Sequence, residues 1–221
     1  MKRILVFGDS NSWGYTDEDN GQRYEKRWPI LLSQELIQKG FNTEIIEDCL
    51  PGRTTNIDDP QDGIHLNGAK VLKSSLLSHS PIDLVILMLG TNDLKFRFQR
   101  TAENIADGIK ELIQIVLDTN SGSGGWHDVH KSNLVVICPP SLGEKSYYPN
   151  WINFKEWEGG LEKSTELHFS FEKVCSQMGV HLIDANEFCQ SSSIDPIHWS
   201  KKMHLKFSEN LANIIDQKIK L

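Results

Sequence analysis

The feature that most constrains the fold of this chain is the alternation of short strand-like runs with segments of helical periodicity. The strand-like runs cover residues 4–7, 43–46, 84–89, 134–138 and 180–183. Apolar residues recur at three- and four-residue spacing, as in amphipathic helices, over 27–39, 68–78, 102–117, 162–178 and 206–219. Repeated β-α units imply right-handed crossovers. We therefore predict a three-layer α/β/α fold with a five-stranded, parallel, doubly wound sheet in one domain spanning 1–221.

Charge and cysteine spacing limit the partners and cofactors of such a domain. Lysine and arginine number 23 against 30 aspartates and glutamates, which gives a net charge of −7. Broad nucleic-acid or lipid-headgroup binding usually needs a basic surface, so we expect neither partner. The four cysteines lack zinc-site spacing, and no nucleotide-binding loop is present, so we expect free thiols, no metal and no cofactor.

The first apolar run also bears on localisation. It ends at Gly8 and is too short for a signal peptide's apolar region or for a membrane span. We therefore expect a cytoplasmic protein with no membrane attachment.

Polar residues lie after two of the expected strands and before the last expected helix. Ser10 comes just after the first strand, Asn92 just after the third, and Asp195 and His198 lie in the segment before the last helix. Each motif alone is more typical of a turn or a capped helix. Parallel sheets gather the carboxyl ends of their strands on one edge, however, and serine catalysis needs a hydroxyl, a histidine base, an orienting acid and oxyanion donors. Together these residues predict a serine hydrolase.

These motifs resemble the four blocks of the SGNH (GDSL-type) hydrolases, and they occur in that family's order. The blocks are Gly8-Asp9-Ser10, Gly52, Gly90-Thr91-Asn92-Asp93 and Asp195-x-x-His198. Further stretches at 53–60, 66–68, 87–93 and 158–160 resemble the aryl-esterase/acyltransferase branch of the family. Asn11 stands where the family commonly has leucine or threonine after the serine.

The resemblance implies a role for each block. Ser10 is expected to be the nucleophile, His198 the general base and Asp195 its orienting acid. The backbone N–H groups of Ser10 and Gly52 and the side-chain amide of Asn92 are expected to form the oxyanion hole. Gly52 enters through the resemblance alone, since the Pro51-Gly52 pair by itself predicts only a turn.

The same resemblance implies hydrolysis of small, short-acyl aryl or alkyl esters through an acyl-enzyme, with acyl transfer as a further activity. Trp13, Ile197 and Trp199 are expected to line a narrow acyl pocket. The two tryptophans serve equally well as core or subunit contacts. Lys95 is expected to face solvent, and the glycine-rich stretch at 121–125 is expected to be a mobile surface loop.

Two other functions remain open at this point. A carbohydrate O-acetyl esterase uses the same triad on a different substrate. A flavodoxin-like protein that binds a phosphate-bearing cofactor shares the expected fold but has no role for Asn92, Asp195 or His198. The aromatic loop at 139–160 is an expected contact of a homo-oligomer.

Overall fold

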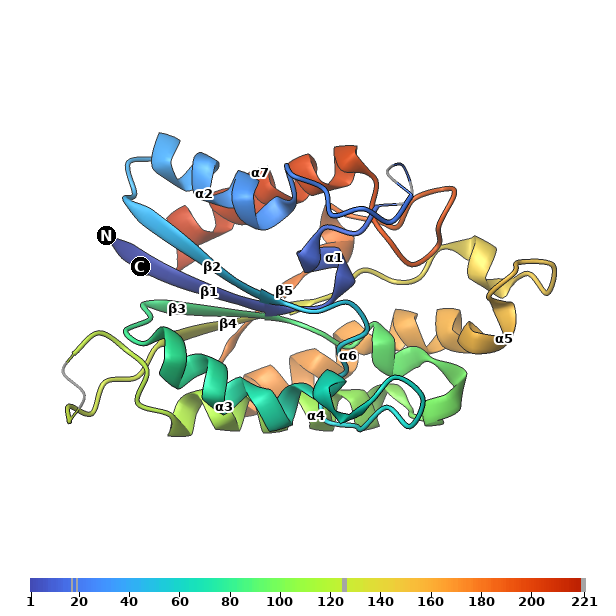
Figure 1. Cartoon of the computed structure of the whole chain (residues 1–221), viewed down its shortest axis with the longest axis horizontal. Helices are drawn as coiled ribbons and strands as arrows, with labels where there is room; N and C mark the ends of the chain where they lie inside the picture. Colours follow the sequence, from blue (N-terminus) through green and yellow to red (C-terminus); the bar gives the residue numbers. More distant parts are fainter. Residues whose placement is uncertain (17, 19, 125–126, 220–221) are drawn as a thin grey trace.

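The computed structural model describes residues 1–16, 18, 20–124 and 127–219. Its described strands form one five-stranded parallel sheet in the order β2-β1-β3-β4-β5, as Figure 1 shows. The strands are β1 (Lys2–Gly8), β2 (Thr43–Cys49), β3 (Leu84–Met88), β4 (Asn133–Cys138) and β5 (His181–Asp184). After β1 the chain adds β2 on one side of it and then crosses over to add β3, β4 and β5 on the other side. The direction in which strands are added to the sheet therefore reverses between β1 and β3. The predicted doubly wound fold is confirmed.

Helices cover both faces of the sheet (Figure 1). Helices α2 (Trp28–Gln38) and α7 (Lys201–Lys218) pack together on one face. Helices α3 (Gly68–His79), α4 (Ala102–Asp118) and α6 (Gly160–Met178) cover the other.

Burial along β1 explains why that strand is continuously apolar. Ile4 and Val6 belong to the core under α2 and α7, whereas Leu5 and Phe7 belong to the core under α3, α4 and α6. Successive side chains of a strand point to opposite faces, so a strand covered on both sides needs apolar residues throughout.

Two predicted boundaries differ from the structure for identifiable reasons. Helix α7 begins at Lys201, five residues before the expected start, because Ser200 caps it by accepting the Met203 N–H. Lys201, Lys202 and His204 make its first turn mostly polar, so the apolar periodicity did not include it. Strand β2 continues to Cys49 because its pairing with β1 runs on to the Gly8–Cys49 register pair.

The two long loops are more ordered than the sequence indicated. The 139–160 loop contains a 3₁₀ turn at Glu144–Tyr147 and the one-turn helix α5 (Phe154–Trp157). The prediction of a mobile surface loop at 121–125 is wrong for Ser121, which is fully buried. Its carbonyl accepts the Ile82 N–H and its hydroxyl lies 2.8 Å from that of Ser132. Gly125 lies outside the described residues.

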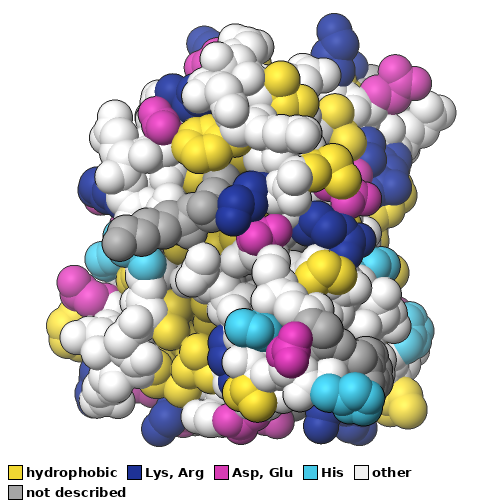
Figure 2. All heavy atoms as spheres, turned by 90° about the vertical axis from the view of Figure 1, so that its left-hand side faces the viewer, with side chains coloured by type: hydrophobic (Ala, Val, Ile, Leu, Met, Phe, Trp, Pro, Cys, Tyr) yellow, Lys and Arg dark blue, Asp and Glu magenta, His cyan; other side chains and the backbone are white. Residues whose placement is uncertain are grey.

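The two ends of the sheet differ in character. Loops gather at the carboxyl ends of the strands, on the right of Figure 1. The opposite end interleaves basic and acidic side chains over its surface (Figure 2). No helix within the described part of the chain is long and apolar enough to span a membrane.

Candidate active site

Ser10 is the first residue of the one-turn helix α1 (Ser10–Trp13), which follows β1 through a tight turn at Asp9. Asp9 caps this helix, its carboxylate accepting the Asn11 N–H at 3.1 Å. Gly8 allows the turn to fold back closely, because a Cβ there would lie 2.3 Å from the Ser12 hydroxyl oxygen. The turn presents Ser10 at the carboxyl end of β1, the second strand of the sheet.

The segment before α7 brings His198 and Asp195 to Ser10. Nε2 of His198 lies 3.0 Å from the Ser10 Oγ, and its Nδ1 lies 2.6 Å from Oδ2 of Asp195. The other oxygen of Asp195 accepts the Ile197 and His198 backbone N–H groups at 2.8 and 3.3 Å. The carboxylate thus holds both the backbone and the ring of the histidine three residues further on.

The environment of Asp195 favours its ionised form. Burial alone raises the pKa of this carboxyl group, but the hydrogen bond and charge of His198 and the two backbone N–H donors outweigh it. The pKa of Asp195 is therefore lowered from its usual value. An ionised carboxylate at Nδ1 keeps the proton on that nitrogen and leaves Nε2 free to accept the serine proton.

Gly52 and Asn92 line the same cavity as Ser10 and His198, which has a volume of about 270 Å³. Gly52 has a φ of +87°, a left-handed conformation in which glycine is favoured, so the turn after β2 depends on this residue. The Asn92 side-chain amide donates to the Arg53 carbonyl at 3.2 Å, which leaves its second N–H for another acceptor. Four blocks far apart in the sequence thus meet at one cavity.

Comparison with known proteins agrees with this geometry. Residues 6–206 match the model of the GDSL-like lipase/acylhydrolase family. The chain belongs to this family. An arylesterase of Vibrio mimicus is 31% identical over 147 residues, which is 65% of this chain and 59% of that protein, so the chain aligns with little more than half of this curated relative.

Solved structures align over nearly the whole chain. The inhibitor-bound aryl esterase of M. smegmatis is 38% identical with a TM-score of 0.87, and it covers 97% of this chain and 98% of its own. A carbohydrate acetylesterase from Sinorhizobium meliloti is 35% identical with a TM-score of 0.86 at the same coverage. The expected family is confirmed, and with it an enzyme class of carboxylic ester hydrolases.

A buried carboxylate joins two of the GDSL-like blocks. Asp93 is fully buried, and it accepts the Thr55 N–H at 3.0 Å and the Thr55 hydroxyl at 2.6 Å. Arg100 pairs with it at 2.6 Å. Burial nevertheless raises the pKa of Asp93, against the lowering effects of Arg100 and Thr55. This network ties the loop after Gly52 to the loop of Asn92, a role the sequence did not reveal.

A second connection runs through Asn11. Its side-chain amide donates to the Ile197 carbonyl at 3.2 Å, and its amide oxygen accepts the Trp199 N–H at 3.2 Å. These backbone groups lie on either side of His198. Asn11 therefore joins the turn at Ser10 to the segment of His198, although the sequence marked it only as a departure from the family's usual residue.

Asp9 completes the polar surroundings of Ser10. It is almost fully buried, and that burial raises the pKa of Asp9 to about 6, against the lowering effects of the Asn11 N–H and of His198. The ring of Tyr15 covers His198 with a centroid separation of 4.1 Å. The burial of Asp9 and the contact between Tyr15 and His198 both depend on the turn at Ser10, and residue spacing could not have predicted them.

The three residues expected to line the acyl pocket are placed differently. Ile197 lines the Ser10 cavity, but the described lining includes neither Trp13 nor Trp199. Trp199 is fully buried against Phe207, with ring centroids 4.7 Å apart, so it packs the core under α7. Trp13 lies half-buried with the Arg23 guanidinium 5.5 Å from its ring centroid.

Lys95 does not face solvent as expected. It is only 8% exposed and lines the Ser10 cavity. Its ammonium lies 3.3 Å from a Glu156 oxygen and 5.7 Å from the centroid of the Trp157 ring. Glu156 and Trp157 belong to α5, so the 139–160 loop reaches the cavity, where Glu156 pairs with the charge of Lys95.

Proposed function

We propose that this protein is a serine esterase that hydrolyses small, short-acyl esters through an acyl-enzyme. The supporting observation is the chain of contacts from the Ser10 Oγ through His198 to Asp195, at 3.0 and 2.6 Å, facing a cavity. A flavodoxin-like cofactor-binding protein would have no role for these three residues. The sheet order is common to both functions and therefore does not distinguish them.

The proposed reaction proceeds in two steps. His198 takes the Ser10 proton on Nε2 while Oγ attacks the ester carbonyl carbon, and the resulting imidazolium is stabilised by Asp195. Collapse of the tetrahedral intermediate breaks the ester C–O bond, and the imidazolium protonates the departing alcohol. Water then attacks the acyl-enzyme with His198 as base, releasing the acid and restoring the serine.

The oxyanion of each intermediate needs donors that are already in place. Among the described hydrogen bonds, the backbone N–H groups of Ser10 and Gly52 donate to no protein acceptor. Together with the free N–H of the Asn92 amide they supply three donors on one cavity. Asp93 holds the two loops that carry Gly52 and Asn92, so these donors need little rearrangement during the reaction.

The size and lining of the cavity favour short acyl groups. A volume of about 270 Å³ lies at the lower end of the range for small-molecule sites. Apolar surface comes from Ile197 and Trp157, and polar surface comes from Lys95, Glu156 and Asn153. Such a cavity suits an acetyl or propionyl ester better than a long acyl chain.

The deciding experiment combines active-site labelling with a substrate series. A fluorophosphonate probe should label the wild-type protein at Ser10 and leave Ser10→Ala unlabelled. Turnover of aryl esters should fall as the acyl chain lengthens from acetate to octanoate. Undiminished hydrolysis by Ser10→Ala would exclude the triad mechanism.

Acyl transfer to an alcohol is a further part of the proposal. The same acyl-enzyme that water resolves can be resolved by an alcohol held near His198. Adding a primary alcohol to the aryl acetate assay should yield the corresponding alkyl acetate. Release of the aryl alcohol with acetate as the sole acyl product would restrict the enzyme to hydrolysis.

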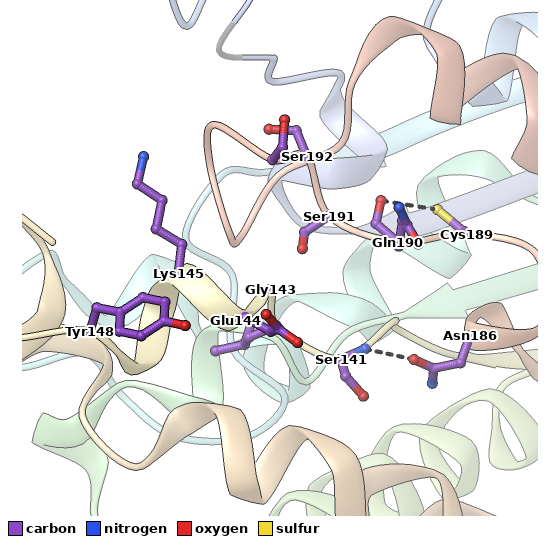
Figure 3. A pocket seen from close by; sticks show the side chains of 12 residues that line it. Ser141, Gly143, Glu144, Lys145, Tyr148, Asn186, Cys189, Gln190, Ser191 and Ser192 are labelled. Atoms are coloured by element: carbon purple, nitrogen blue, oxygen red, sulfur yellow. Dashed lines mark hydrogen bonds between the residues drawn. The ribbon is translucent and has the colours of Figure 1, made fainter.

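Deacetylation of acetylated carbohydrates is the second candidate, favoured by a polar cavity of about 660 Å³ shown in Figure 3. Hydroxyl, amide and charged side chains line it, among them Ser141, Lys145, Asn186 and Gln190. It adjoins the segment that carries Asp195, since the Asp195 N–H donates at 2.8 Å to the hydroxyl of Ser192, another lining residue. Turnover on acetylated sugars and on aryl acetates of equal concentration separates the two substrate classes.

The 139–160 loop supports the proposal of a homo-oligomer. Tyr147, Tyr148 and Ile152 on this loop are 59%, 51% and 91% exposed. Clustered exposed apolar side chains are typical of interaction surfaces. Light scattering should give a mass above that of one chain, and a monomeric mass would contradict the proposal. A cytoplasmic location stays a prediction of the sequence.

A further inference from the structure

We propose that Cys138, His168 and Asp184 form a binding site for Zn²⁺ at the β4–β5 edge of the sheet. Each residue offers one ligand atom, and the three atoms lie within 4.8 Å of one another. The residues are far apart in the sequence, so no spacing motif marks them. This inference is independent of the proposed esterase function, and either can fail without the other.

The parallel sheet and helix α6 create the site. Cys138 and Asp184 are register partners at the carboxyl ends of β4 and β5, so their side chains point to the same face. Helix α6 packs against both strands on that face and supplies His168 (Figure 1). Three separate elements thus converge on one point.

The contact between His168 and Asp184 leaves a buried nitrogen atom available to a cation. Nδ1 of His168 is buried and makes no hydrogen bond within the described part of the chain, although Asp184 Oδ2 lies only 3.3 Å away. Zinc bonds of about 2.0–2.1 Å to nitrogen and oxygen place two such atoms about 3.3 Å apart across a tetrahedral ion. The separation of 3.3 Å matches the one expected for two ligand atoms on a tetrahedral zinc ion.

The surroundings orient the carboxylate for this role. Oδ1 of Asp184 accepts both the N–H and the side-chain amide of Asn186, at 3.0 and 2.7 Å, which leaves Oδ2 directed toward His168. Outer contacts of this kind commonly hold metal ligands in position. Cys138 is fully buried, and its sulfur needs to approach the other two ligand atoms by up to about 1.2 Å for a bond of about 2.3 Å to zinc.

The donor set specifies the class of metal. A thiolate, an imidazole and a carboxylate together suit zinc, whereas magnesium and calcium prefer oxygen ligands alone. Binding replaces the Cys138 thiol proton by the metal and releases that proton to solvent. Three protein ligands leave the fourth position of a tetrahedral zinc ion for a water molecule.

Cobalt titration of the full-length protein tests the proposal directly. Co²⁺ added to chelator-treated protein should produce a thiolate-to-cobalt charge-transfer band that saturates at one equivalent and disappears when Zn²⁺ is added. His168→Gln and Cys138→Ser should abolish the band. The matched controls His181→Gln, at an exposed histidine of β5, and Cys189→Ser should retain it.

Thermal unfolding supplies a second readout. Zn²⁺ should raise the midpoint of wild-type unfolding in a concentration-dependent manner and leave that of His168→Gln unchanged, since a ligand stabilises only a fold that binds it. His168 is partly exposed, so this variant is expected to fold even where Cys138→Ser does not. Absence of the cobalt band, or its persistence in His168→Gln, overturns the proposal.

Discussion

Replacing Asn11 by alanine removes the two hydrogen bonds that join the turn at Ser10 to the segment of His198. Both bonds are buried, and both partners are backbone groups beside His198. Leaving a buried donor or acceptor without a partner costs about 1–3 kcal/mol each. We therefore expect Asn11→Ala to lower the free energy of unfolding by about 2–6 kcal/mol.

The same substitution should also disturb the contact between His198 and Ser10. The Ile197 and Trp199 backbone groups fix the position of the His198 ring relative to Ser10. A displacement of about 1 Å in a catalytic group can cost about 100-fold in rate. We expect kcat for an aryl acetate to fall by about 10- to 100-fold with a smaller change in KM, because Asn11 itself does not line the cavity.

Ser12→Ala is the matched control for this experiment. Ser12 lies in the same turn, it is fully buried, and its hydroxyl has no hydrogen-bond partner among the described residues. Its removal should therefore leave kcat close to the wild-type value. Urea unfolding and steady-state kinetics on both variants check the argument, and Asn11→Leu, the family's common residue, should behave like Asn11→Ala. Wild-type stability and kcat in Asn11→Ala would refute the reasoning.

Three further predictions concern the same site. Asn92→Ala should lower kcat by about 10²–10³-fold, the usual loss for one oxyanion donor, and a loss under tenfold in the aryl acetate assay would remove Asn92 from the hole. Asp195→Asn should lower kcat by about 10⁴-fold, because the amide favours the wrong imidazole tautomer; the single-turnover acylation rate measures this, and an unchanged rate would contradict the role. The raised pKa of Asp9, about 6 against 3.8 unfolded, stabilises the fold below pH 4, and this contribution is lost as the pH rises through 6. In urea unfolding, the free energy of unfolding of Asp9→Asn relative to that of the wild type should therefore rise by about 3 kcal/mol between pH 4 and pH 7. A difference between the two proteins that stays constant with pH would contradict the buried-carboxyl explanation.

Much of this protein was predictable because the relevant physics is local. The doubly buried strands required continuous apolar runs, and the helices required three- and four-residue periodicity. Ser10, Asn92 and the Asp195–His198 pair follow from strand ends that a parallel sheet gathers on one edge. Helix ends were less accurate, as at α7, because a polar capped turn carries no periodic signal.

The functions of other residues could not be predicted from spacing. Lys95 faces the cavity because α5 supplies Glu156 beside it, and Trp199 is buried because it packs on Phe207 of α7. Asn11 and Asp93 each hold segments far away in the chain. Their roles depend on which segments meet in space, and a side chain's own neighbours in the sequence do not specify that.

The sequence by itself therefore determined the layered α/β architecture, the family and the chemical types at the site, since these depend on periodicity and on the order of residues along the chain. Only the tertiary structure decided how the four blocks are held together, which side chains line the cavity, and where Cys138, His168 and Asp184 converge. These features arise from distances between distant segments, which packing of the sheet and helices sets and which no local pattern encodes.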